Sequence, residues 1–166
     1  MPSLQFLQRA MEISVVLAKR VRGLDADTLL SFTRRAVRFA GLRGGLTVRV
    51  TSSAEMRKMN RWFREKDKPT DVLSFVAESV PGYAGDIAIS MDIAAENAKR
   101  LGHPLADEVK VLILHGMLHL AGYDHETDRG EMAERERQLR LELGLPLALT
   151  ERGATRKRRR RSVAAR

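Results

Sequence analysis

Three of the chain's four histidines lie in one short segment, from His115 to His125. His115 and His119 belong to a long apolar run without proline, from Glu108 to Ala121, which predicts a largely buried helix. Residues four positions apart in a helix lie on the same face, one turn from each other. We therefore expect the two imidazoles to point at one common position.

Gly122 follows the predicted helix where a left-handed residue is expected, and glycine adopts that backbone conformation without strain. A reversal at Gly122 would bring His125 back beside His115 and His119. Three neutral imidazoles give a zinc ion three ligands and leave its fourth position open, as in catalytic rather than structural sites. The sequence thus predicts one zinc ion per chain, bound by these three histidines.

A lone histidine on an apolar helix face is usually a core residue, but the spacing here is typical of a metal site. The metzincin signature H-E-x-x-H-x-x-G-x-x-H matches the chain at these three histidines and at Gly122. Position 116, however, is glycine, where metallopeptidases carry the glutamate that serves as general base. The ligand set is therefore predicted without the usual peptidase base.

The string from His115 to His125 resembles the signature of the YbeY family of bacterial zinc-dependent endoribonucleases. Upstream segments resemble that family in the same order: Asn60–Arg64 followed by Pro69–Phe75, and then Gly85–Ser90. The resemblance implies hydrolysis of phosphodiester bonds in single-stranded RNA, during maturation of the 3′ end of 16S ribosomal RNA and in ribosome quality control. It also implies partners: ribosomal RNA, and the ribosomal subunit or ribosome-associated proteins.

Two residues are predicted to act beside the metal ligands. By the resemblance, Arg64 is the arginine that contacts the scissile phosphate, a role for which the planar guanidinium is well suited. From its position alone, Arg64 would be an exposed arginine at a helix C-terminus, favoured by the helix dipole. Asp124 is expected first to orient an imidazole through its second N–H. The alternatives for Asp124 are to accept a proton or to shape the turn.

Three further polar residues are weaker candidates. Asp71 and Asp86 lie in the family-like segments, but an aspartate beside a strand most often forms a turn or a cap. His103 precedes Pro104 and is predicted to be a solvent-exposed loop residue rather than a metal ligand. The predicted site therefore includes none of the three.

The composition fits a soluble globular protein: 166 residues, of which 43% are hydrophobic and 31% are charged. Cysteine is absent, so disulfides are excluded and any zinc must be bound by histidine or carboxylate. No segment has the length of a membrane span, and the N-terminus lacks the pattern of a secretory signal. These features predict a cytoplasmic protein with one catalytic metal-dependent domain over residues 1–150.

The net charge of +9 is concentrated at the C-terminus. From Glu151 onward there are eight basic residues and one acidic residue, which leaves 22 basic and 20 acidic residues before them. A block of like charge such as Arg156–Arg161 does not fold and would attract polyanions through counterion release. Residues 151–166 are predicted to be a disordered basic tail that binds RNA without sequence specificity; the alternative is a solvated extension without function.

Apolar alternation or apolar runs predict four short strands, which are Ile13–Leu17, Leu46–Val50, Asp71–Val76 and Asp86–Ser90. The third strand is almost entirely apolar, which favours a central position in the sheet.

Helical spacing and capping residues predict the helices that connect these strands. The helix that opens at Ser52 is expected to turn Met56, Met59 and Phe63 inward, and the last helix is expected to run from Asp128 to Pro146. The whole pattern predicts an α+β fold, with a small, mostly mixed four-stranded sheet packed with about five helices, one of them a zincin-like metal helix.

Two other functions are compatible with the sequence. A zinc metallopeptidase or amidohydrolase shares the ligand spacing, although Gly116 argues against it. A non-catalytic ribosome-assembly factor would use its zinc ion structurally and bind RNA with its tail. Turnover on RNA and on peptides distinguishes all three.

Overall fold

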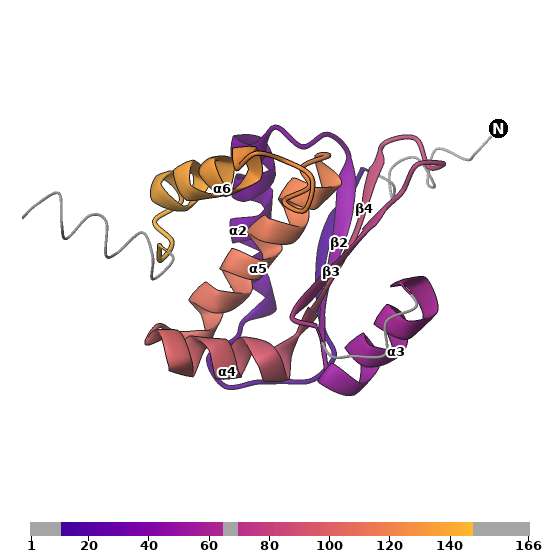
Figure 1. Ribbon diagram of the computed structural model, residues 1–166. Coiled ribbons are helices and arrows are strands. Elements are labelled where there is room, and N and C mark those ends of the chain that lie inside the picture. The colour runs from indigo at the N-terminus through magenta and orange to yellow at the C-terminus, as the bar shows by residue number, and fades with distance from the viewer. Residues whose placement is uncertain (1–10, 65–69, 148–166) are drawn as a thin grey trace, which may run out of the picture.

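The computed structural model describes residues 11–64 and 70–147, which form four strands and five helices (Figure 1). The strands are β1 (Ile13–Leu17), β2 (Gly45–Thr51), β3 (Val72–Val76) and β4 (Tyr83–Ser90). The helices are α2 (Ala26–Ala40), α3 (Ser53–Arg64), α4 (Met91–Leu101), α5 (Leu105–Leu120) and α6 (Glu131–Glu142). The predicted α+β fold is confirmed, and none of these helices is both long and apolar enough to cross a membrane. The predicted basic tail lies outside the described residues.

The four strands form one mixed sheet in the order β1, β2, β4, β3. β1 and β2 are parallel, as are β2 and β4, whereas β3 runs antiparallel to β4. β3 is therefore an edge strand, and the prediction of a central position is wrong. Helices contact both faces of its centre, since Leu73 packs with Met56 of α3 and Ser74 faces α5, whereas Val76 at its end is 56% exposed.

The helices cover the two faces of the sheet unequally. α2, α5 and α6 lie on one face, and α3 lies on the other (Figure 1). The main core lies beneath the larger group of helices, and a smaller cluster lies beneath α3. Phe63 was predicted to face inward, but it is 69% exposed because it lies at the edge of the sheet, where its ring contacts Phe75 of β3.

Asp128 caps the start of α6, as the capping pattern predicts. It lies two residues before the N-cap position rather than at it. The Met132 N–H donates to the Asp128 carboxylate at 2.8 Å, and the N-cap itself is Gly130. The helix ends at Glu142 rather than at Pro146. Asp128 thereby ties the segment that follows α5 to the first turn of α6.

α5 is the central helix of the fold. It packs against α2, α4 and α6, and also against β3 and β4. Its end is closed by a hydrogen bond from the Tyr123 N–H to the Leu118 carbonyl at 3.0 Å. Gly122 has a φ of +97°, which confirms the left-handed glycine expected from the sequence. The chain can therefore reverse immediately after the last turn of α5.

Gly116 allows α5 to approach the sheet closely. A Cβ at this position would lie 2.8 Å from Ile87 Cγ2 and 3.0 Å from Ser74 Oγ. The Ser74 hydroxyl also donates to the Gly116 carbonyl at 2.9 Å. Any side chain at position 116 would therefore push α5 away from β3 and β4.

We expect Gly116→Ala to destabilise the protein by about 1 kcal/mol or more, because overpacking costs more than the helix propensity of alanine returns. Urea denaturation measures the change in the free energy of unfolding. In a double-mutant cycle with Ile87→Ala, which removes the nearest atoms, the penalty should fall by at least half. Full additivity of the two substitutions would contradict this account of the contact.

Candidate metal centre

The three predicted histidines converge in the structure. One nitrogen from each of His115, His119 and His125 lies within 4.8 Å of the others. The Nε2 atoms of His115 and His119 are 3.2 Å apart. Two ligands of a tetrahedral zinc ion, each at about 2.0–2.1 Å from the metal, would be separated by about 3.3 Å. The spacing of these two nitrogens therefore fits a shared metal ion.

The local fold explains how the three rings meet. His115 and His119 lie one turn apart on α5, and the reversal at Gly122 returns the chain so that His125 lies beside them. The ring centroid of His125 is 5.4 Å from that of His115 and 5.1 Å from that of His119. Helix periodicity and one left-handed glycine are sufficient to assemble the cluster.

Hydrogen bonds on the far side of two rings fix which nitrogens face the centre. His119 Nδ1 lies 3.0 Å from the Tyr123 carbonyl oxygen, which can only accept, so Nδ1 donates. His115 Nδ1 lies 3.4 Å from a carboxylate oxygen of Glu136, so it donates as well. With Nδ1 as the donor, Nε2 is the nitrogen of each ring that faces the other ring and could bind a cation. A cation bound to both nitrogens stabilises this arrangement.

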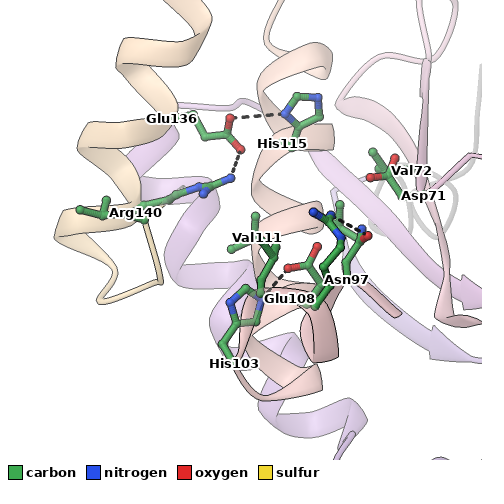
Figure 2. A pocket seen from close by; sticks show the side chains of 13 residues that line it. Asp71, Val72, Asn97, His103, Glu108, Val111, His115, Glu136 and Arg140 are labelled. Atoms are coloured by element: carbon green, nitrogen blue, oxygen red, sulfur yellow. Dashed lines mark hydrogen bonds and ion pairs between the residues drawn. The ribbon is translucent and has the colours of Figure 1, made fainter. Parts of the chain in front are cut away.

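Glu136 of α6 was not identified from the sequence. Its second carboxylate oxygen accepts a hydrogen bond from Arg140 at 3.1 Å (Figure 2). Burial alone would raise the pKa of Glu136, but the hydrogen bond from His115 and the charge of Arg140 outweigh it and lower the pKa. The carboxylate is thus ionised at neutral pH and holds the His115 ring. The sequence shows only an ordinary i,i+4 pair of Glu136 and Arg140.

The Asp124 side chain makes turn-shaping hydrogen bonds, whereas its orientation of an imidazole and its role as proton acceptor stay predictions. Its carboxylate accepts from the Glu126 N–H at 3.0 Å and from the Thr127 hydroxyl at 3.2 Å. Its carbonyl accepts from the Asp128 N–H at 3.0 Å. These bonds shape the loop that carries His125, whereas Glu136 and the Tyr123 carbonyl contact the other two rings. A direct catalytic role of Asp124 stays a prediction.

The imidazoles open into a cavity of about 750 Å³. Its walls come from α5, the loop after α5, β3 and α3, and its polar lining includes Asn60, Thr70, Asp71, Ser74, Asp124 and Glu126. Asn60 lies on α3 one turn before Arg64, which is the last residue of that helix. The side chain of Arg64, the predicted phosphate ligand, lies outside the described part of the chain. The C-terminal turn of α3 therefore lies beside the cavity.

The structure separates the two weaker aspartate candidates. Asp71 precedes β3 and lines the metal cavity. Asp86 lies within β4, where the Tyr83 hydroxyl donates to its carboxylate at 2.7 Å. Of these two residues, only Asp71 lines this cavity.

The prediction that His103 is exposed is wrong. Its side chain is only 8% exposed, and its Nε2 lies 2.6 Å from a carboxylate oxygen of Glu108, which is also buried. The tight connection between α4 and α5 folds His103 back against the first turn of α5. A buried carboxylate needs a hydrogen-bonding partner, and His103 is the partner of Glu108. The composition of the loop does not reveal this structural role.

Gly116 explains why no glutamate occupies the position of the peptidase base. The position is buried against the sheet, and the space of a side chain there is filled by Ile87 and Ser74. The missing base is therefore a consequence of how α5 packs on the sheet.

The fold and the cluster together define a single α+β domain with three histidines that could hold one metal ion at an open cavity. The chain belongs to the YbeY family, because the family model described as Endoribonuclease YbeY matches residues 11–144. It is 56% identical to Endoribonuclease YbeY of Koribacter versatilis over 138 residues, which covers 83% of this chain and 90% of the relative.

Other relatives agree. Endoribonuclease YbeY of Solibacter usitatus is 42% identical, with 84% of this chain and 93% of the relative covered. The solution structure of TM1509 from Thermotoga maritima is similar with a TM-score of 0.54 and 29% identity, and the match covers 79% of this chain and 88% of that one. The similarity thus extends over the sheet and the helices that carry the cluster.

We expect the purified protein to contain one divalent metal ion per chain, and His119→Ala to lose it, because two imidazoles no longer form a three-ligand site. Elemental analysis measures the metal content. His103→Gln is the matched control, since His103 lies outside the cluster, and it should retain the metal. Equal metal content in both variants would contradict the assignment of ligands.

Glu136→Gln should weaken metal binding by about 10–100-fold, because the neutral amide supports the His115 ring less well than the carboxylate. Competition with a chelator of known affinity measures the change. Glu142→Gln, an exposed residue at the end of the same helix, is the control and should bind metal as the wild type does. Unchanged affinity in Glu136→Gln would show that this hydrogen bond does not support the site.

Proposed function

We propose that the protein is a zinc-dependent endoribonuclease that cleaves single-stranded RNA, with ribosomal RNA precursors as its substrates in the cytoplasm. The observation that supports this most is the convergence of His115, His119 and His125 at the wall of an open cavity. Membership in the YbeY family supports the reaction class, since the relatives are named endoribonucleases.

The donor set suits hydrolysis of a phosphodiester. A divalent metal ion bound by three neutral ligands keeps its full charge, so it can polarise a phosphoryl oxygen and lower the pKa of water. The protein's own residues fix the geometry: Glu136 and the Tyr123 carbonyl hold two imidazole rings, and the Asp124 loop carries the third. The substrate phosphate would thus meet a preorganised site.

Arg64 is proposed as the residue that binds the scissile phosphate. The negative charge that accumulates on the phosphoryl oxygens in the transition state needs donors beyond one metal ion, and a guanidinium supplies two parallel ones. The location of α3 supports this role, because Asn60, one turn before Arg64, lines the metal cavity.

RNA is favoured over a peptide as substrate because the peptidase base is absent and its space is filled. Ribosomal RNA or a ribosomal subunit as partner is consistent with the basic run Arg156–Arg161, which would attract any polyanion. We include this run in the proposal as an electrostatic tether without sequence specificity.

The wild-type protein with zinc should cleave single-stranded RNA and leave peptides intact. Arg64→Ala should lower kcat by about 10²–10³-fold, the loss expected for one donor that stabilises transition-state charge. Arg61→Ala, an exposed arginine on the same helix, is the charge-matched control and should retain nearly full activity. Gel analysis of a labelled oligoribonucleotide measures cleavage.

Other outcomes of this assay distinguish the rival functions. Cleavage of peptides without cleavage of RNA would favour a peptidase. A folded, zinc-loaded protein that binds RNA without turnover would favour a non-catalytic assembly factor. Equal losses in Arg64→Ala and Arg61→Ala would remove the specific role of Arg64.

A further inference from the structure

A second cavity, of about 290 Å³, is lined by residues of α4, α5 and α6 and by Asp71 and Val72 at the start of β3 (Figure 2). The two cavities share three lining residues, Asp71, Val72 and His115. A chain molecule bound at the metal ligands could therefore extend into the second cavity without leaving the protein surface. The space suits a single small group rather than a further length of polymer.

The lining of this second cavity combines apolar side chains with polar ones. Apolar side chains from three parts of the fold contribute to it, including Val72 of β3 and Val111 and Leu112 of α5. Polar side chains complete the lining, among them Asn97 and Arg100 of α4. A ligand that fits such a site has an apolar face and an edge that forms hydrogen bonds, as a nucleobase does.

The charges disfavour a phosphate group here. Three carboxylates line the cavity, those of Asp71, Glu108 and Glu136, beside the guanidinium groups of Arg100 and Arg140. An anion in the cavity would be repelled by these carboxylates, whereas a neutral base would not. The phosphate therefore belongs at the histidines, and an uncharged part of the same nucleotide chain belongs in the second cavity.

The polar edge has hydrogen-bonding capacity left for a ligand. Arg100 Nη2 donates to Asn97 Oδ1 at 3.3 Å, which orients both groups. The amide N–H groups of Asn97 and further guanidinium N–H groups of Arg100 can donate to the carbonyl or ring nitrogen acceptors of a base. Asp71 offers acceptors from the side shared with the metal cavity. By contrast, the Glu108 and Glu136 carboxylates are already bonded to His103 and His115.

We propose that this cavity binds the nucleobase of the nucleotide next to the scissile phosphate, with Asn97 and Arg100 as its hydrogen-bonding residues. The inference rests on the proposed endoribonuclease function and adds a subsite to it. The apolar lining contacts the face of the base, and the α4 residues contact its edge. Binding there aligns the adjoining phosphodiester with the three histidines.

The test compares one oligoribonucleotide, whose cleaved bond has been mapped, with versions that carry an abasic ribose on either side of that bond. For the wild type, one abasic substitution should raise KM about tenfold, because the base no longer fills the cavity or accepts about two hydrogen bonds. The Asn97→Ala, Arg100→Ala double variant should show the same raised KM on the intact substrate. It should discriminate little between the intact and abasic substrates.

The control is Lys99→Ala, which removes a positive charge from the same helix at an exposed position outside the cavity. It should keep the wild-type KM and the wild-type discrimination against the abasic substrate. The double variant should retain its metal ion and its thermal unfolding midpoint, since Arg100 is exposed, Asn97 is only partly buried, and neither belongs to the hydrophobic core. These readouts distinguish a subsite from a general loss of structure.

Two results would overturn the inference. If the double variant discriminates between intact and abasic RNA as strongly as the wild type, the cavity does not bind the base. If the double variant and Lys99→Ala raise KM equally, the effect is only the loss of positive charge. Failure of the proposed function looks different: the wild type would then cleave none of the RNA substrates, and the subsite would fail with it.

Discussion

The candidate metal centre depends on two imidazole nitrogens that face each other. The Nε2 atoms of His115 and His119 lie 3.2 Å apart because each ring donates its other nitrogen outward, to Glu136 and to the Tyr123 carbonyl. A divalent cation bound by both nitrogens would satisfy two Nε2 lone pairs held at this distance. The hydrogen bonds on the outer side of the rings therefore prepare the inner side for a metal ion, and the rest of the domain keeps those outer partners in place.

That preparation uses the whole fold. α5 packs closely against the sheet because Gly116 presents no side chain to Ile87. This close packing positions the histidines beside β3, the edge strand of the sheet. α6 then crosses near α5 and supplies Glu136. The packing that excludes a glutamate at position 116 also removes the usual peptidase base. Under the proposed function, a site built this way favours a substrate whose charge is stabilised by the metal ion and Arg64 over one that needs a carboxylate base.

The sequence was sufficient to predict those parts of the site that depend on residues close together in the chain. The spacing of His115 and His119 and the bend at Gly122 follow from helix geometry and from glycine's backbone freedom, and both could be predicted. Contacts between distant segments could not. Glu136 is 21 residues from His115 and has no motif of its own, and His103 was placed in solvent because its partner Glu108 belongs to the next helix. β3 was assigned to the centre because apolar character reports burial, which here comes from helices on both faces rather than from flanking strands.

X-ray absorption at the zinc edge on the zinc-loaded protein measures directly which atoms coordinate the metal ion. We expect three nitrogen ligands of the imidazole type at about 2.0–2.1 Å from the zinc ion, with the remaining coordination supplied by a light atom from solvent. In the His119→Ala variant the imidazole contribution should fall by one third or the zinc signal should be lost. A zinc ion coordinated without imidazole, or by four protein ligands in a closed site, would contradict the account.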